Sequence, residues 1–161
     1  MSNFSAGHES RTIWTGVSRF AYPTRHIEAD NRLSWLLGRL DAAYGDTAYY
    51  IHLTRDREDT AQSFLKRYDK GIMDAYHRTI LSGSRTRNKE TPPIEFCRDY
   101  YDTVNGNISL FLRDKTHKMN MQLENIREQW PQFWGWIGAE GDFSSALREW
   151  DVRHNESAPQ P

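Results

Sequence analysis

The sequence predicts an α/β fold with a small parallel sheet and predominantly helical content. Two short segments, residues 47–54 and 117–123, have the composition of strands, and stretches of helical periodicity lie before, between and after them. The first segment is almost wholly apolar, which favours a strand buried on both faces of a parallel sheet. In the second, apolar and polar residues alternate from Met119 to Leu123. Strands that alternate with helices are typical of α/β domains, although two strands are too few for a stable three-layer sheet.

Helical periodicity accounts for most of the remaining chain. A helix is expected over residues 31–44, where Asp30 can cap the first turn and Gly45 can end the last one. Further helices are expected from the acidic residues after Arg55 to Tyr68, from Ile72 to Leu81, from Pro92 to about residue 113, from Ile126 to Ile137, and from Asp142 to Trp150. Asn105-Gly106-Asn107 interrupts one of them with a turn signal, but its flanks do not alternate as hairpin strands do, so the helix is favoured. Residues 1–26 and 82–91 are interpreted as irregular, and residues 155–161 as a disordered tail.

Length and composition restrict the class of protein. The chain has 161 residues, enough for one compact domain over residues 1–154. Lys and Arg number 21 against 22 Asp and Glu, so no global charge favours nucleic acid or an anionic membrane as a partner. The N-terminus has no basic or apolar region typical of a signal peptide, and no apolar run is long enough to span a membrane, so a cytoplasmic location is expected.

The cysteine, the histidines and a group of tryptophans do not indicate a functional site. The single cysteine, Cys97, falls on the apolar side of a predicted helix and is interpreted as a core residue. Six scattered histidines show no metal-ligand spacing, so no metal is predicted. Trp130, Trp134 and Trp136 are interpreted as packing residues and not as a carbohydrate platform.

The stretch from Tyr50 to Phe64 is the part of the sequence that most suggests chemistry. A predicted strand ends at Arg55 and a predicted helix follows. In open α/β sheets, ligands bind beyond the carboxyl ends of the strands, and the planar guanidinium of an arginine suits phosphate. The alternative is an arginine paired with a nearby carboxylate such as Asp56 or Asp59, and strand-end position alone favours this alternative.

Ser63 follows Arg55 eight residues later, and this strand–Arg–acidic turn–helix–Ser arrangement resembles the 3′-phosphate motif of PAPS-dependent sulfotransferases. Residues 27–35, 71–76 and 134–138 resemble the bacterial and phage-type members, so the resemblance covers residues 4–154. It implies a P-loop-type three-layer fold, PAPS or PAP as the bound nucleotide, and binding of the 3′-phosphate by Arg55 and Ser63. It also implies transfer of a sulfuryl group to a hydroxyl on a carbohydrate or small metabolite.

The sequence departs from that family at its start. Nothing in it matches the first strand, the Gly/Ser/Thr-rich phosphate loop and the helix that bind the 5′-phosphosulfate, so a truncated fold is expected. We expect coding sequence upstream of Met1 to supply these elements, and the 161 residues alone to be poorly soluble and inactive. The family's second strand corresponds to a strand ending near Gly7-His8-Glu9. The resemblance therefore implies Glu9 as the catalytic base, with His8 second, against the alternative of a mobile polar N-terminus.

Two other functions stay open. One is a nonenzymatic remnant or subunit that binds the adenosine 3′,5′-bisphosphate end without catalysis. The other is a P-loop kinase relative that uses ATP, which the Arg55–Ser63 pair makes less favoured. The expected partners are a hydroxyl-bearing small molecule or glycan acceptor, with neither nucleic acid nor membrane, and a homo-oligomer is allowed.

Overall fold

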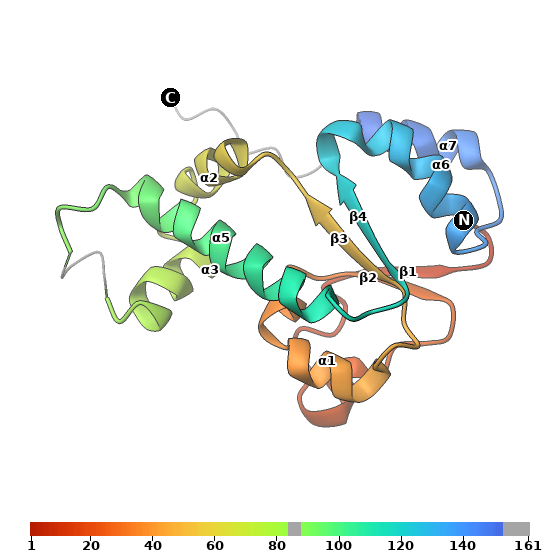
Figure 1. Ribbon diagram of the computed structural model, residues 1–161, viewed down its shortest axis with the longest axis horizontal. Helices are drawn as coiled ribbons and strands as arrows, with labels where there is room; N and C mark the ends of the chain where they lie inside the picture. Colours follow the sequence, from red (N-terminus) through yellow and green to blue (C-terminus); the bar gives the residue numbers. More distant parts are fainter. Residues whose placement is uncertain (84–87, 153–161) are drawn as a thin grey trace. The chain divides into compact units, whose positions relative to one another are not determined.

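The computed structural model describes residues 1–83 and 88–152, and within them the protein is mixed α/β, with six α-helices and two small sheets (Figure 1). The expected tail over residues 155–161 lies outside the described residues. The chain divides into two compact units. The described part of the first unit comprises residues 1–53 and 111–152, and that of the second comprises residues 54–83 and 88–110.

Each sheet of the first unit consists of two parallel strands. β1 (Ser5–His8) pairs with β2 (His26–Ala29), with Ser5 opposite His26 and Gly7 opposite Glu28. β3 (Tyr50–Thr54) pairs with β4 (Lys118–Gln122), and the Tyr50 amide donates a hydrogen bond to the His117 carbonyl at 2.9 Å. The strands expected near residues 47–54 and 117–123 are thereby confirmed. β1 lies within residues 1–26, where the residue pattern indicates irregular chain, and β2 begins at the last residue of that stretch.

The helix expected over residues 31–44 forms in two pieces. A 3-10 helix (Asn31–Trp35) precedes α1 (Leu37–Tyr44), and the two are interrupted at Leu36. The Asp30 carboxylate accepts a hydrogen bond from the Arg32 amide, and Gly45 ends α1 in a left-handed conformation with a φ of 53°. Both helix boundaries predicted from the sequence are therefore confirmed.

The C-terminal helices of the first unit form its apolar core. α6 (Ile126–Trp136) contains Pro131 and follows a 3-10 turn (Leu123–Asn125), while α7 (Phe143–Arg148) begins at an Asp142 cap and is followed by a 3-10 turn (Glu149–Asp151). Buried Met121, Ile126 and Phe133 pack with partly buried residues, namely Ile27, Met119, Trp130, Trp136, Ile137 and Trp150. The tryptophans are thus packing residues, as the sequence predicts.

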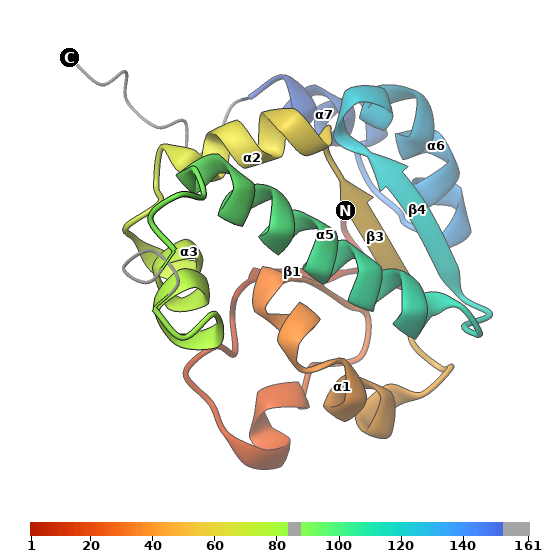
Figure 2. The same cartoon turned by 60° about the vertical axis from the view of Figure 1, so that its left-hand side comes forward.

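The second unit is helical. α2 (Arg57–Leu65) is capped by Asp56, and α3 (Gly71–Ala75) continues into a π-helical turn (Tyr76–Ile80). α5 (Pro93–Leu112) is continuous through residues 105–107, so the expectation of a helix there is confirmed. α2 and α3 lie along α5 (Figure 2), and the buried residues include Tyr68, Met73, Tyr76, Phe96, Cys97 and Tyr100. Burial also raises the pKa of the Cys97 thiol to about 11, which agrees with a core residue and not a nucleophile.

The expectation that β3 is buried on both faces is wrong. Tyr50 is buried, but Ile51 and Leu53 are 36% and 48% exposed. The reason is that helices packed on a parallel sheet bury its faces, and the face of the two-stranded β3–β4 sheet that carries Ile51 and Leu53 stays partly in solvent. Among the described residues, no helix is long and apolar enough to cross a membrane.

The exposed face of β3 leads to a prediction about solubility. Apolar side chains on a short strand with an open edge promote aggregation, and Thr is a polar β-branched residue that strands favour. We expect the double variant Ile51→Thr/Leu53→Thr to raise the protein concentration at which light scattering begins, with the thermal unfolding midpoint nearly unchanged. The control is Met121→Thr in the neighbouring strand, where a buried side chain is lost and the expected cost is about 2–4 kcal/mol. Equal scattering by the double variant and the wild type would contradict the prediction.

Candidate functional site

Arg55 lies directly after β3 and before α2, at the carboxyl end of a parallel strand as the sequence predicts. The Tyr101 hydroxyl donates a hydrogen bond to the Arg55 carbonyl at 2.9 Å, which ties this turn to α5. The Arg55 side chain is 45% exposed, and its Nη2 lies 3.4 Å from the Asp59 Oδ2. The carboxylate pairing considered from the sequence therefore exists, but as one long contact at the surface.

Two neighbouring arginines of the second unit are bound quite differently. Arg57 makes two hydrogen bonds to the Asp102 carboxylate, at 2.8 and 2.6 Å. Arg98 makes two to Glu58, at 2.9 and 2.7 Å, and a third to Glu95 at 2.5 Å. Hydrogen bonding to these carboxylates raises the pKa of both guanidinium groups and lowers that of Glu58. These bidentate pairs join α2 to α5, whereas the Arg55 guanidinium takes little part in holding the unit together.

Ser63 lies two turns, or ~10 Å, into α2 and is half-buried. Among the described residues, no hydrogen bond joins Ser63 to Arg55. The structure therefore places both residues in one unit without bringing their polar atoms into contact. The N-terminus of α2 is occupied by the Asp56 carboxylate, which accepts a hydrogen bond from the Asp59 amide at 2.9 Å. An anion bound by Arg55 must consequently lie beside the helix and not on its terminal amides.

A hollow of about 400 Å³ lies elsewhere in the second unit. Its lining includes Arg57, Glu95, Arg98 and Asp102, whose charges already neutralise one another in the ion pairs above. Arg55 and Ser63 do not line it. The hollow is therefore not the predicted phosphate site.

The candidate base Glu9 follows the last residue of β1, so the strand ends where the resemblance places it. Glu9 adopts a left-handed conformation with a φ of 51°, which is costly for a residue other than glycine. Its amide donates to the Ala29 carbonyl at 3.0 Å, and its carboxylate forms an ion pair with the Arg32 guanidinium. The predicted base is thus held in a defined place, while His8 is exposed on β1.

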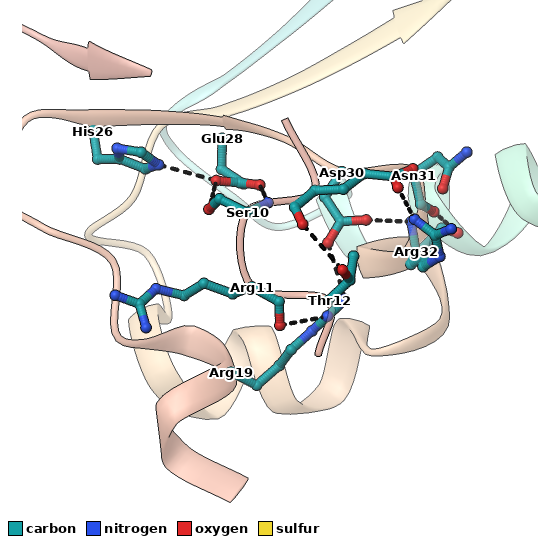
Figure 3. A network of polar contacts seen from close by, with 11 residues as sticks. Ser10, Arg11, Thr12, Arg19, His26, Glu28, Asp30, Asn31 and Arg32 are labelled. Atoms are coloured by element: carbon teal, nitrogen blue, oxygen red, sulfur yellow. Dashed lines mark hydrogen bonds and ion pairs between the residues drawn. The ribbon is translucent and has the colours of Figure 1, made fainter. Parts of the chain in front are cut away.

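A network of side-chain hydrogen bonds in the first unit centres on the Glu28 carboxylate in β2 (Figure 3). The sequence did not predict this network. The amide and hydroxyl of Ser10 donate to the two Glu28 oxygens at 2.7 and 2.6 Å. The Nε2 of His26 lies 3.0 Å from Glu28 Oε2, and its Nδ1 lies 2.8 Å from the Ser5 hydroxyl. Burial would raise the pKa of the Glu28 carboxyl, but the hydrogen bonds from Ser10 and His26 outweigh it and lower the pKa.

A buried ion pair between Arg19 and Asp30 extends this network toward Arg32 (Figure 3). Arg19 Nη2 lies 2.9 Å from Asp30 Oδ2, with both side chains buried, and Arg19 Nη1 donates to the Arg11 carbonyl at 2.6 Å. Asp30 also accepts from the Arg32 amide at 2.8 Å, and Arg32 contacts Glu9. Residues 9–19 are therefore held to the end of β2 by hydrogen bonds and by the Arg19–Asp30 and Arg32–Glu9 ion pairs. No spacing rule identifies these partners, because Ser5 and His26 lie 21 residues apart, Glu9 and Arg32 lie even further apart, and all of them meet only in the folded chain.

Comparison of the chain with family models, with curated proteins and with solved structures found no match. The function must therefore be argued from the side chains described above.

Gly7 leads to a prediction because it makes room for the Glu28 carboxylate. A Cβ added at Gly7 would lie 2.6 Å from Glu28 Oε2 and 2.9 Å from the Ser10 Cβ. We expect Gly7→Ala to lower the free energy of unfolding by about 1–3 kcal/mol, since the network cannot shift without losing hydrogen bonds. Gly38→Ala is the control, because Gly38 lies in α1 with open space around it and should gain up to about 1 kcal/mol. Urea unfolding of both variants measures the difference, and equal stability of the two would contradict the role given to Gly7.

Proposed function

We propose that the chain is a PAPS-dependent sulfotransferase component that binds the 3′-phosphate of the nucleotide through Arg55. The observation that carries the proposal is the position of Arg55 together with the weak pairing of its guanidinium. Arg55 occupies the carboxyl end of a parallel strand, and its only described side-chain hydrogen bond is the 3.4 Å contact with Asp59. A dianionic phosphate that accepts two hydrogen bonds from the guanidinium would be a stronger partner than that single surface contact.

Ser63 is proposed as the second phosphate ligand. Its hydroxyl lies on the helix that starts two residues after Arg55, on a half-buried position. The Asp56, Glu58 and Asp59 carboxylates surround the start of α2, so the phosphate is directed away from that end and along the helix. Contact between the phosphate and both side chains would require the Arg55 side chain to turn from Asp59, which its exposure allows.

Glu9 is proposed as the base of the transfer step. The acceptor hydroxyl oxygen forms a bond to the sulfur, the bond from sulfur to the phosphate oxygen of PAPS breaks, and the hydroxyl proton passes to the Glu9 carboxylate. Arg32 holds the carboxylate and fixes its orientation. Glu9 and Arg55 belong to different units, so the role proposed for each residue is inferred only from the contacts within its own unit.

The nonenzymatic alternative is favoured by one specific observation. None of the 161 residues matches the phosphate loop that holds the 5′-phosphosulfate, and sulfuryl transfer depends on positioning and neutralising that charge. On the proposal, the 161 residues alone bind PAP and do not turn over PAPS. A segment that supplies the loop would restore turnover for the enzyme and leave a nonenzymatic binder inactive.

The first functional prediction concerns nucleotide choice. We expect PAP to bind more tightly than AMP, because only PAP carries the 3′-phosphate. Arg55→Ala should weaken PAP binding by on the order of 2 kcal/mol, about 30-fold, and should leave AMP binding unchanged. Isothermal titration calorimetry of both nucleotides measures the effect.

Two variants sharpen this titration. Arg55→Lys retains the charge and loses the planar fork, so it should fall between wild type and Arg55→Ala. Arg113→Ala removes an exposed arginine of the first unit and should change nothing. Equal affinity of the wild type for PAP and AMP would overturn the proposal.

The second functional prediction concerns the base. In a preparation that turns PAPS over, Glu9→Gln should lower the rate by ~10²–10⁴-fold with little change in PAP affinity, because Gln retains the shape and cannot accept the proton. Initial rates and a parallel PAP titration separate the two effects. His8→Gln is the comparison variant and should stay near the wild-type rate. An unchanged rate in Glu9→Gln would move the role to another residue such as His8 or His26.

A further inference from the structure

We propose that Asp69, Asp74 and His77 form a binding site for a divalent transition-metal ion such as Zn²⁺ or Mn²⁺. All three belong to the second unit, and one ligand atom from each lies within 4.8 Å of the other two. The Nε2 of His77 is 3.7 Å from Asp74 Oδ1 and 3.9 Å from Asp69 Oδ1. The site is independent of the phosphate proposal, because neither Arg55 nor Ser63 belongs to it.

The histidine is fixed before any ion arrives. His77 is 1% exposed, and its ring stacks on that of Tyr68 with 4.4 Å between centroids and 6° between planes. The ring therefore has one orientation, with Nε2 toward the two carboxylates. Asp69 is 52% exposed whereas Asp74 Oδ1 is buried, so the site is reached from solvent on the Asp69 side and is backed by a rigid imidazole.

The separations suit an ion between the ligands. The His77 Nε2 distances of 3.7 Å to Asp74 and 3.9 Å to Asp69 are longer than a typical N–H···O hydrogen bond of about 2.7–3.2 Å. Zinc bonds to nitrogen and oxygen of about 2.0–2.2 Å in a tetrahedral arrangement place two ligands roughly 3.3–3.5 Å apart. The two His77–carboxylate distances thus need to close by a few tenths of an ångström, and the two carboxylate oxygens, which lie within 4.8 Å of each other, can approach by a rotation of the exposed Asp69 side chain.

The backbone shows why these residues meet. Asp74 lies in α3, and His77 lies in the π-helical turn that follows it. Gly71, with a φ of 58°, begins α3 and turns the chain so that Asp69 returns to the same side. Single π-helical turns within helices occur frequently at functional sites. Spacing among the histidines alone could not identify the site, which is why the sequence predicted no metal.

Ligand chemistry and charge narrow the choice of ion. One imidazole nitrogen with two carboxylate oxygens suits Zn²⁺, Mn²⁺, Fe²⁺ or Co²⁺ better than Ca²⁺ or Mg²⁺, which prefer oxygen alone. Arg78 Nε lies 2.7 Å from Asp74 Oδ1 and compensates one of the two negative charges. This compensation at Asp74 leads us to expect moderate affinity, with water completing the coordination.

The test uses the full chain after treatment with a chelator. Isothermal titration with Zn²⁺ should show one ion bound per chain, and Zn²⁺ should raise the melting temperature because the ion binds the folded state. Co²⁺ should give a visible absorption spectrum typical of nitrogen and oxygen ligands. The buried His77 is unsuitable for a first variant, because its replacement can unfold the unit.

Asp69→Asn is the informative variant, since Asp69 is exposed and its amide analogue preserves the fold. Binding should weaken at least ~10-fold, with the melting temperature without metal unchanged. Asp114→Asn is the control, an exposed aspartate of the first unit that should leave binding unchanged. The absence of Zn²⁺, Mn²⁺ and Co²⁺ binding at 100 µM, or equal binding by Asp69→Asn and the wild type, would overturn the proposal.

Discussion

Parallel pairing of β3 with β4 is the constraint on which the arrangement of the chain depends. Parallel strands cannot be joined by a tight hairpin, so the chain must leave the end of β3 and return to the start of β4 through a crossover. Here the crossover runs from Arg55 to His117, and most of its residues belong to the second unit. Because the crossover begins at the carboxyl end of β3, its first residue is at the position where α/β proteins bind ligands. The place of Arg55 therefore follows from the topology, and the Tyr101–Arg55 hydrogen bond then fixes the turn.

The small sheets also explain where the stability of the first unit comes from. Two parallel strands bury little apolar surface, so the core lies between β4, α6 and the tryptophans. β1 and β2 depend on polar contacts, because Glu28, which pairs with Gly7, is held by hydrogen bonds from Ser10. A buried carboxylate stabilises a structure only when its hydrogen bonds are made, and loss of one partner leaves an expensive unpaired charge. The β1–β2 sheet is for this reason more sensitive to single substitutions near Glu28 than its length suggests.

The sequence predicts those elements that periodicity determines. The twenty residues of α5 keep an apolar face that outweighs the Asn105-Gly106 turn signal, and β4 alternates visibly. β1 is beyond such reasoning, because Ser-Ala-Gly-His has no apolar alternation and is held by partners more than fifteen residues away. The burial of β3 was predicted wrongly, because an apolar run shows what a strand can bury and not whether another element packs on each of its faces. Likewise, the positions of Arg55 and Glu9 follow from strand ends, but their ion pairs with Asp59 and Arg32 require the fold.

The competition between Asp59 and a phosphate decides whether Arg55 can serve as a ligand. An exposed ion pair is worth roughly 0–1 kcal/mol, and this one is long and half in solvent. A charge-assisted hydrogen bond contributes about 1.5–3 kcal/mol, and a phosphate can accept two from one guanidinium. On the proposal, exchange of the carboxylate for a phosphate would therefore be favourable at Arg55. At Arg57 or Arg98 the same exchange would break two or three short hydrogen bonds that join α2 to α5. Of the three arginines Arg55, Arg57 and Arg98, the last two therefore stabilise the second unit, and on the proposal only Arg55 could exchange its partner for an anion with little loss of stability.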